Sequence, residues 1–265
     1  MRFLEIFKKD IKLDIGHSIK GYDIKRQLGE GRYGITYLAQ NSSNELVTIK
    51  QLKKYMLKKT KSKVKYESRI LKELSTLNCN YFPKYIGKFK YEQNIQGYIL
   101  EYIDGNTFSE ILYKENSVFT KIEIYEIALK LLDIVEILES KNIVHNDIMR
   151  TNVMYTPNKE RKLIDFGLAR YIDNKKYKKE LDYWYISDFL VHLHYSNYQE
   201  EKKLLKKKIP WYDDLNLSCK ERDVLMSLMG INNIKYNSIY DIRHDINIIL
   251  KESEDNEHTI LIEQK

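Results

Sequence analysis

The sequence has few cysteines and no long apolar run, and both absences narrow the classes of protein it can encode. Its two cysteines, Cys79 and Cys219, lack the spacing of a metal site or a redox pair, which favours a reducing compartment. No apolar stretch is long enough to span a bilayer. The first 14 residues, MRFLEIFKKDIKLD, are interrupted by charges, unlike a signal peptide. We therefore expect a cytoplasmic protein with no membrane span.

Positive charge is in moderate excess, with a net charge of +7. Lysines cluster in residues 53–65, 175–179 and 202–208, and the first cluster contains no acidic residue. Such runs are usually solvated faces, and the alternative is attraction of an anionic partner. No zinc-finger spacing or RNA-binding aromatic motif accompanies them, so nucleic acid is not favoured. An acidic protein substrate is the partner they suggest, and the sequence does not predict an oligomeric state.

Two polar clusters stand close together in the second half of the chain. They are His145-Asn-Asp147 and Asp165-Phe-Gly167. Between them, residues 153–155 and 162–164 have the composition of two short strands, and Pro-Asn at 157–158 supplies a turn. The sequence therefore predicts a hairpin that separates the two clusters.

This hairpin would bring Asp147, Asn152 and Asp165 to one end of a small ribbon. Two carboxylates and an amide suit Mg²⁺, which takes oxygen ligands and usually shares them with phosphates. A surface loop with ordinary turn-forming residues is the simpler interpretation, but it does not account for the spacing of the two clusters. We therefore treat this stretch as the candidate catalytic centre.

A glycine-rich segment lies near the start of the chain. Gly29, Gly31 and Gly34 fall between strand-like residues 22–28 and 35–39. Glycines at this spacing let the backbone approach a phosphate without interference from a Cβ atom. A dinucleotide-binding fingerprint should instead open a helix. The context therefore favours a hairpin that covers a nucleotide.

A lysine and a glutamate follow, 67 − 50 = 17 positions apart in the sequence. Lys50 ends a predicted strand at residues 46–50, and Glu67 lies on a predicted helix at residues 63–77. The helix could direct Glu67 back towards Lys50 and fix its ammonium group. A solvated helix residue would be the preferred interpretation of Glu67 if the other motifs were missing.

Taken together, these motifs resemble those of eukaryotic-type (Hanks-type) Ser/Thr protein kinases, in the same order and over roughly residues 21–250. The stretch from Tyr98 to Ile103 is similar to the strand and hinge on which adenine rests, with Leu100 in the gatekeeper place. The resemblance implies an α+β, bilobal fold, with a small β-rich N-lobe containing one helix and a larger, mostly helical C-lobe. The implied divisions are a lead-in (1–20), N-lobe and hinge (21–103), C-lobe (104–250) and a tail (251–265).

The resemblance also implies ATP and Mg²⁺, or Mn²⁺ in its place, as cofactors. Lys50 would grip the α- and β-phosphates and be fixed by Glu67, while Asp147 would orient the acceptor hydroxyl and take its proton. Asp165 and Asn152 would hold the metal ions. The remaining nucleotide-binding residues would be Gly29, Gly31 and Gly34 over the phosphates and Leu100, Glu101 and Ile103 at the adenine.

Two C-lobe helices are expected. The first, over residues 120–141, begins at a capping box formed by Thr120 and Glu123. The second begins near Asp182, which matches the family's aspartate that ties back to the catalytic loop.

The segment after Asp165 departs from the family pattern. Only 182 − 165 = 17 positions separate Asp165 from Asp182, without an Ala-Pro-Glu motif, and no Ser or Thr lies between Phe166 and Ile186. Asn146 replaces the arginine that pairs with a phosphorylated activation loop in regulated kinases. We therefore expect a shortened segment that Ser/Thr phosphorylation does not control, with its tyrosines as the residual route.

A further departure concerns the γ-phosphate. Met149 stands where Ser/Thr kinases usually carry a lysine, and the adjacent Arg150 could substitute, although its register points it elsewhere. Three functions remain open. They are a Ser/Thr protein kinase, a small-molecule or Bud32-like atypical kinase, and a pseudokinase that serves as a binding module.

Overall fold

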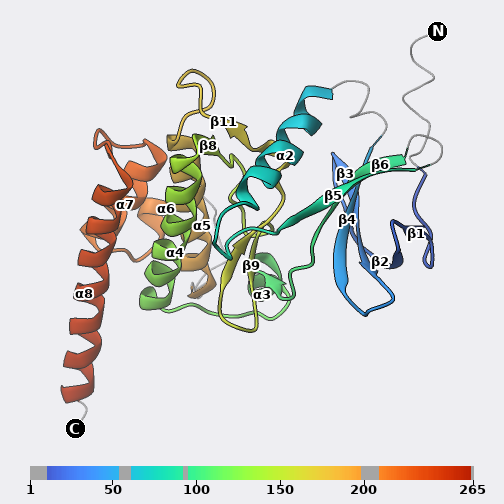
Figure 1. The fold of residues 1–265 in the computed structure, drawn as a ribbon. Coiled ribbons are helices and arrows are strands. Elements are labelled where there is room, and N and C mark those ends of the chain that lie inside the picture. The colour runs from blue at the N-terminus through green and yellow to red at the C-terminus, as the bar shows by residue number, and fades with distance from the viewer. Residues whose placement is uncertain (1–10, 54–60, 92–94, 198–208, 264–265) are drawn as a thin grey trace. The chain divides into compact units, whose positions relative to one another are not determined.

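The structure is a computed structural model that describes residues 11–53, 61–91, 95–197 and 209–263 (Figure 1). The first ten residues of the lead-in and the lysines within 54–60 and 202–208 lie outside these residues. The chain divides into two compact units. The first comprises Met1–Gly105 with Thr156–Ala169, and the second comprises Asn106–Tyr155 with Arg170–Lys265.

The first unit is built on a six-stranded antiparallel sheet with the order β1-β2-β3-β4-β6-β5. One helix in the described part of this unit, α2 (Lys61–Leu74), accompanies the sheet, and it starts and ends slightly earlier than the sequence pattern predicts. The strands are β1 (Ser18–Ile19), β2 (Tyr22–Glu30), β3 (Gly34–Gln40), β4 (Leu46–Leu52), β5 (Tyr85–Tyr91) and β6 (Ile95–Glu101).

Alternation along the strands gives the sheet two different faces. Tyr37 of β3 pairs with Ile49 of β4, and Ile49 pairs with Ile99 of β6. These side chains belong to one buried apolar cluster, which also contains Leu13 from the lead-in. Because successive side chains of a strand point to opposite faces, Lys50 lies on the other face from Ile49. The apolar core thus fixes the face on which Lys50 is presented.

A turn and a short helical segment complete the first unit. The turn after Tyr155 is closed by Thr156 N donating to Glu160 O at 3.1 Å and Lys159 N donating to Thr156 O at 2.9 Å. It leads to strand β10 (Arg161–Leu163) and the 3₁₀ helix η2 (Phe166–Leu168). The predicted turn and second strand are therefore present.

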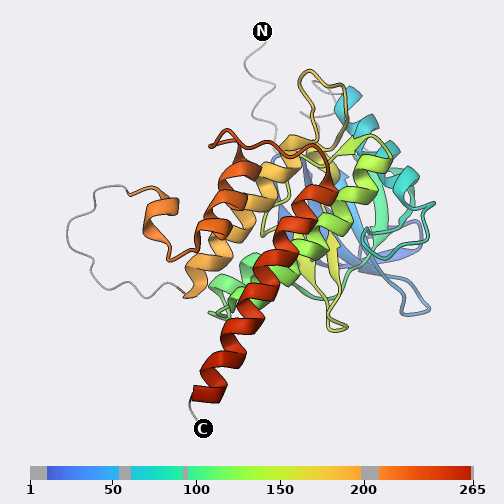
Figure 2. The same ribbon diagram turned by 90° about the vertical axis from the view of Figure 1, so that its left-hand side faces the viewer.

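The second unit is mostly helical. Helix α4 packs against α5 and α8, and α7 packs against α5 and α8 (Figures 1 and 2). The helices are α3 (Phe108–Tyr113), α4 (Lys121–Ser140), α5 (Glu180–His194), the 3₁₀ turn η3 (Tyr195–Asn197), α6 (Trp211–Asp214), α7 (Cys219–Met229) and α8 (Ile239–Glu263). The short strands are β7 (Asn106–Thr107), β8 (Ile143–Val144), β9 (Val153–Tyr155) and β11 (Arg170–Tyr171).

The predicted capping box of α4 is present. The side chain of Thr120 accepts from Glu123 N at 3.2 Å, and Glu123 Oε2 accepts from Thr120 N at 2.8 Å. Two of the four unsatisfied amides at the start of this 20-residue helix are thereby capped. Among the described residues, no helix is both long and apolar enough to cross a membrane.

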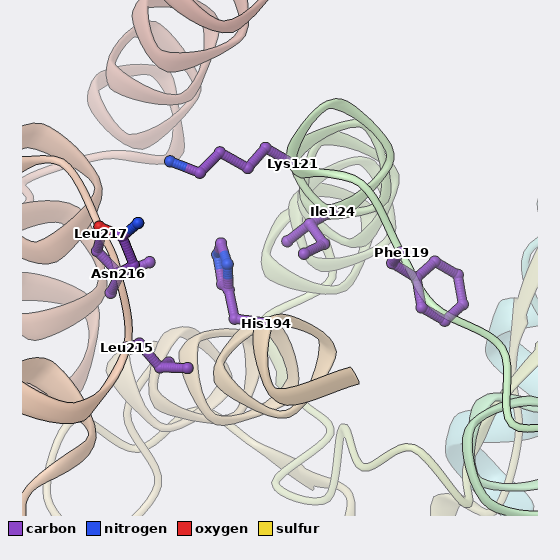
Figure 3. A pocket seen from close by; sticks show the side chains of 7 residues that line it. All are labelled: Phe119, Lys121, Ile124, His194, Leu215, Asn216 and Leu217. Atoms are coloured by element: carbon purple, nitrogen blue, oxygen red, sulfur yellow. The ribbon is translucent and has the colours of Figure 1, made fainter. Parts of the chain in front are cut away.

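A pocket of about 220 Å³ lies in the second unit where α4, the end of α5 and residues 215–217 meet (Figure 3). Lys121 at its edge is already paired, because its Nζ lies 2.8 Å from Glu221 Oε2. The His194 ring contacts Tyr125 edge-on at 5.7 Å, and its Nε2 has no hydrogen-bond partner in the described part of the chain. Burial lowers the pKa of His194 to about 4, although the Glu221 carboxylate opposes this shift. His194 is therefore neutral near pH 7.

The buried His194 predicts a specific acid sensitivity. Its pKa is about 4 when folded and near its ordinary 6.5 when unfolded, so the unfolded state binds more protons between these pH values. Stability should therefore fall as the pH drops from 6.5 towards 4. Relative to His194→Phe, the wild type should lose on the order of 2 kcal/mol between pH 6.5 and 4.5 in urea unfolding.

The exposed His244 on α8 supplies the matched control. His244→Phe should show the same pH dependence of unfolding as the wild type. If the unfolding free energies of the wild type and His194→Phe ran parallel over this range, His194 would not be the group responsible.

Candidate active site

Lys50 lies between two carboxylates in the first unit. Its Nζ is 2.6 Å from Glu67 Oε1 and 2.6 Å from Asp165 Oδ1. Strand β4 supplies the lysine, α2 supplies the glutamate, and the residue before η2 supplies the aspartate. The Glu67 side chain is 4% exposed and that of Asp165 is 45% exposed. Glu67 is thus the buried partner, while Asp165 retains an accessible carboxylate.

The carboxylates keep the lysine charged. Burial alone would lower the pKa of Lys50, but Glu67, with help from Asp165, raises it well above its ordinary value. The Tyr98 ring lies 5.8 Å from the ammonium, within range of a cation–π interaction. A buried ammonium needs this compensation, because an unpaired buried charge is strongly destabilising. The cluster is therefore a fixed positive centre beside an exposed carboxylate.

The backbone fixes the position of Asp165. Its φ is +60°, a left-handed conformation that Asp tolerates better than most residues. Its Oδ1 also accepts from Gly167 N at 3.2 Å. Phe166 is fully buried and contacts Phe82 edge-on at 5.7 Å. The aromatic anchor and the turn together direct the aspartate towards Lys50.

The glycine-rich loop is the tip of the β2–β3 hairpin. Gly31 N donates to Gly34 O at 2.9 Å, and Lys53 N donates to Tyr33 O at 3.1 Å. A Cβ atom on Gly34 would lie 2.4 Å from Gln51 O, so strand packing alone requires glycine there. Atoms around Gly29 and Gly31 leave open space where a Cβ would stand. The loop is thus tied down at its base, with open surroundings at two of its glycines.

Of the hinge residues predicted from the sequence, Leu100 and Glu101 end β6 and Ile103 follows it. Leu100 and Ile103 are buried, and Glu101 N donates to Lys84 O at 2.9 Å. The Glu101 carboxylate accepts from Lys84 N at 3.1 Å and lies 3.6 Å from Lys162 Nζ. These contacts hold the strand end in place.

Gly97 is a residue of this site that the sequence analysis missed. A Cβ atom there would lie 1.9 Å from Lys50 O, so only glycine lets β6 approach β4 beside the lysine. A glycine within an apolar strand is the signal that could have revealed this close approach.

The second unit brings Asp147 and Asn152 together. Asn152 Nδ2 donates to Asp147 Oδ2 at 2.9 Å and to Asp147 O at 3.0 Å. The loop between them is closed by Met149 N donating to Asp147 O and by Asn152 N donating to Met149 O, both at 2.8 Å. The loop is compact, and the Asn152 amide oxygen is not used in these bonds.

Asp182 of α5 anchors this loop through hydrogen bonds to its backbone. Its carboxylate accepts from His145 N at 2.8 Å and from Asn146 N at 2.7 Å, the contact expected from the sequence. Burial raises the pKa of Asp182 to about 7, although the two amides lower it. Asn146 has a φ of +60°, and Asn adopts this conformation more readily than a bulkier residue. Asn146 therefore contributes to the loop through its left-handed backbone conformation and its amide bond to Asp182.

Arg150 is engaged away from the loop. Its Nη1 lies 3.2 Å from Asp188 Oδ2 on α5, and its side chain is only 14% exposed. This agrees with the expectation that its register points it elsewhere than to a γ-phosphate. Arg150 therefore does not replace the lysine that Ser/Thr kinases usually carry at the place of Met149.

Each unit contributes an oxygen donor of the type that suits a hard cation. In the described residues, no three His, Cys, Asp or Glu side chains cluster as a preformed metal site. Mg²⁺ does not require one, because it commonly uses one or two carboxylates together with water and substrate phosphates. The exposed Asp165 carboxylate and the Asn152 amide oxygen are ligands of the appropriate type.

Most of the chain matches a known protein family. The family model described as protein kinase domain matches residues 22–203. The chain is 30% identical over 232 residues to the probable serine/threonine-protein kinase YbdM of Bacillus subtilis, covering 85% of this chain and 88% of YbdM.

Two longer relatives are matched only in part. Identity is 31% to the serine/threonine-protein kinase dst4 of Dictyostelium discoideum, over 58% of this chain and 31% of dst4. It is 30% to the serine/threonine-protein kinase PknA of Nostoc, over 56% of this chain and 28% of PknA. The chain therefore belongs to the eukaryotic-type Ser/Thr protein kinase family.

Proposed function

We propose that this protein transfers the γ-phosphate of ATP to a serine or threonine hydroxyl of a protein substrate, with Mg²⁺, or Mn²⁺ in its place. The observation that carries the proposal is Lys50 held charged between Glu67 and Asp165. The names of its relatives support Ser/Thr as the acceptor class.

Phosphoryl transfer depends mainly on positioning and on neutralising charge. Lys50 would bind the α- and β-phosphates, and Glu67 would fix the direction of its ammonium. The backbone amides of Gly29, Gly31 and Gly34 would cover the phosphates, and Leu100, Glu101 and Ile103 would hold the adenine. These roles need a cation that remains charged, which the pKa of Lys50 ensures.

Asp165 and Asn152 would hold the metal. When bound, the metal neutralises the negative charge of the phosphates. Asp147 would accept the proton of the acceptor hydroxyl, and its contact with Asn152 Nδ2 limits the directions in which its carboxylate can turn. His145, fully buried, supports the loop through its backbone bond to Asp182.

The segment after η2 is held by hydrogen bonds within the chain. Asp173 Oδ1 accepts from the backbone amides of Lys175, Lys176 and Tyr177, each at 2.9 Å. The buried Arg170 lies over the Tyr177 ring at 5.9 Å. This carboxylate satisfies three consecutive amides of the segment and fixes its turn. We therefore propose an enzyme that is competent without Ser/Thr phosphorylation of this segment.

The same segment supports an acidic substrate. Strand β8 leads directly into the loop that contains Asp147, and β11 pairs with β8. Residues 173–179 follow shortly after β11, so they begin beside the strand that leads into this loop. Lys175, Lys176 and Lys178 are exposed on this turn. Their shared charge favours acidic residues in a peptide that reaches Asp147.

The proposed reaction is tested by phosphate transfer from radiolabelled ATP to generic protein substrates. Asp147→Ala should lower kcat by roughly 10²- to 10⁴-fold, because the general base is lost. Asp213→Ala, which removes an exposed aspartate of α6, should keep wild-type transfer. Label appearing only on a small acceptor would indicate a small-molecule kinase. Nucleotide binding without transfer by the wild type would indicate a pseudokinase.

The acidic-substrate proposal is tested by Lys175→Ala combined with Lys178→Ala. This variant leaves Lys176 over Tyr177 and the Lys179 bond to Asn237 O in place. The KM for an acidic peptide should rise roughly three- to tenfold at low salt with kcat unchanged, since exposed charge contacts affect binding and are screened by salt.

The charge-matched control is Lys88→Ala with Lys90→Ala, two exposed lysines of β5. Its KM for the acidic peptide should equal that of the wild type. An equal rise in KM for neutral and acidic peptides in the Lys175 and Lys178 variant would contradict acidic selectivity.

A further inference from the structure

The segment Ile11–Leu13, named here the N-terminal strap, is bonded to the sheet of the first unit. Gln51 Nε2 donates to Ile11 O at 2.6 Å, and Leu13 N donates to Tyr37 Oη at 3.1 Å. Tyr37 Oη in turn donates to Gln51 Oε1 at 3.2 Å. The strap precedes the part of the chain that matches the protein kinase domain.

The bonded groups are buried. Tyr37 is 1% exposed and Gln51 is 3% exposed, and Leu13 belongs to the apolar cluster of the sheet. Buried polar groups nearly always have partners, and here the strap backbone supplies them. The strap is therefore part of the folded unit. Residues 11–13, which the sequence placed in an unspecified lead-in, are held in the fold without forming a helix or a strand.

Lys12 links the anchored strap to the glycine-rich loop. Its Nζ lies 2.7 Å from Glu30 Oε2, and Lys53 Nζ lies 2.8 Å from Glu30 Oε1. The hydrogen bonds from Lys12 and Lys53 lower the pKa of Glu30 to about 2, so the carboxylate is ionised. Lys12 also donates to Gln27 Oε1 at 3.4 Å. Because Glu30 stands between Gly29 and Gly31, both lysines act on the loop itself.

The charges of Glu30 and its two lysines determine how this contact affects phosphate binding. An unpaired carboxylate within the loop would repel phosphates, whereas Glu30 with two lysines forms a group with a net charge of +1. The Lys53 backbone already ties the loop through Tyr33 O. Lys12 adds a second tie from the strap, whose own position is fixed by the buried Tyr37 and Gln51.

We propose that Lys12 is a positioning residue for nucleotide binding, which acts by holding and neutralising Glu30 in the glycine-rich loop. The inference rests on the proposed function, since that function places phosphates beneath this loop. Lys12 itself need not touch the nucleotide. Its effect should therefore appear in nucleotide affinity and depend on Glu30.

The test is the dissociation constant of ATP with Mg²⁺, measured by calorimetry on the full chain. Lys12→Ala should weaken binding roughly two- to fivefold at low salt, the range of an exposed ion pair, and Lys12→Arg should restore it. In a Glu30→Gln background, Lys12→Ala should have a clearly smaller effect, because the carboxylate that it holds is gone. Lys25→Ala on β2, an exposed lysine with the same charge change, should bind as the wild type does.

The outcomes separate this inference from the proposed function. Unchanged affinity in Lys12→Ala, or an equal loss in the Glu30→Gln background, would overturn the inference while leaving phosphate transfer intact. Binding of ATP without transfer by the wild type would overturn the proposed function, and the affinity series would still decide the role of Lys12. A wild type that does not bind ATP would overturn both.

Discussion

The burial of the Lys50 ammonium is the constraint on which the first unit depends. A buried charge is tolerated only with compensating partners, and removing one partner of a buried pair costs roughly 3–5 kcal/mol. Here the partners come from segments far apart in sequence, with Glu67 on α2 and Asp165 before η2. One electrostatic requirement therefore joins the sheet, its helix and the Asp-Phe-Gly turn. The close approach of β6 at Gly97 completes the surroundings of the lysine.

The second unit solves a similar problem with backbone groups. The Asp182 carboxylate, 1% exposed, accepts from two consecutive amides of the loop that contains Asp147. Asp173 repeats this device on the surface with three consecutive amides of the following segment. In both places a carboxylate fixes the conformation of a loop by accepting hydrogen bonds from its consecutive amides. Hydrogen bonds within the chain therefore hold both segments in place.

Much of the fold followed from local sequence signals. The capping box at Thr120 predicted the start of α4, because capping depends on residues that are neighbours in the chain. The contact of Lys50 with Glu67 was anticipated from the predicted strand and helix that carry them, and the contact of Asp182 with the loop was anticipated from the family resemblance. The ends of α2 were less well predicted, since an apolar stripe fixes the face of a helix better than its boundaries.

Other features could not be predicted from the sequence, because they depend on contacts between distant residues. The N-terminal strap looked like an unspecified lead-in, and only the buried Tyr37 and Gln51 show why it is ordered. The closeness of Gly97 to Lys50 O arises from strand pairing, and the triple contact of Asp173 arises from loop geometry. A glycine inside an apolar strand indicates a close approach but not the atom that approaches. Asp173 has no pattern in the sequence that distinguishes it from other turn-forming aspartates.

Glu67 is proposed to hold Lys50 in the geometry that phosphate transfer requires. The most direct measurement is the rate of transfer from radiolabelled ATP by Glu67→Gln, which preserves side-chain shape and removes the charge. We predict a fall in kcat of at least roughly tenfold, because a misdirected ammonium no longer stabilises the phosphates. Transfer at the wild-type rate would contradict the account.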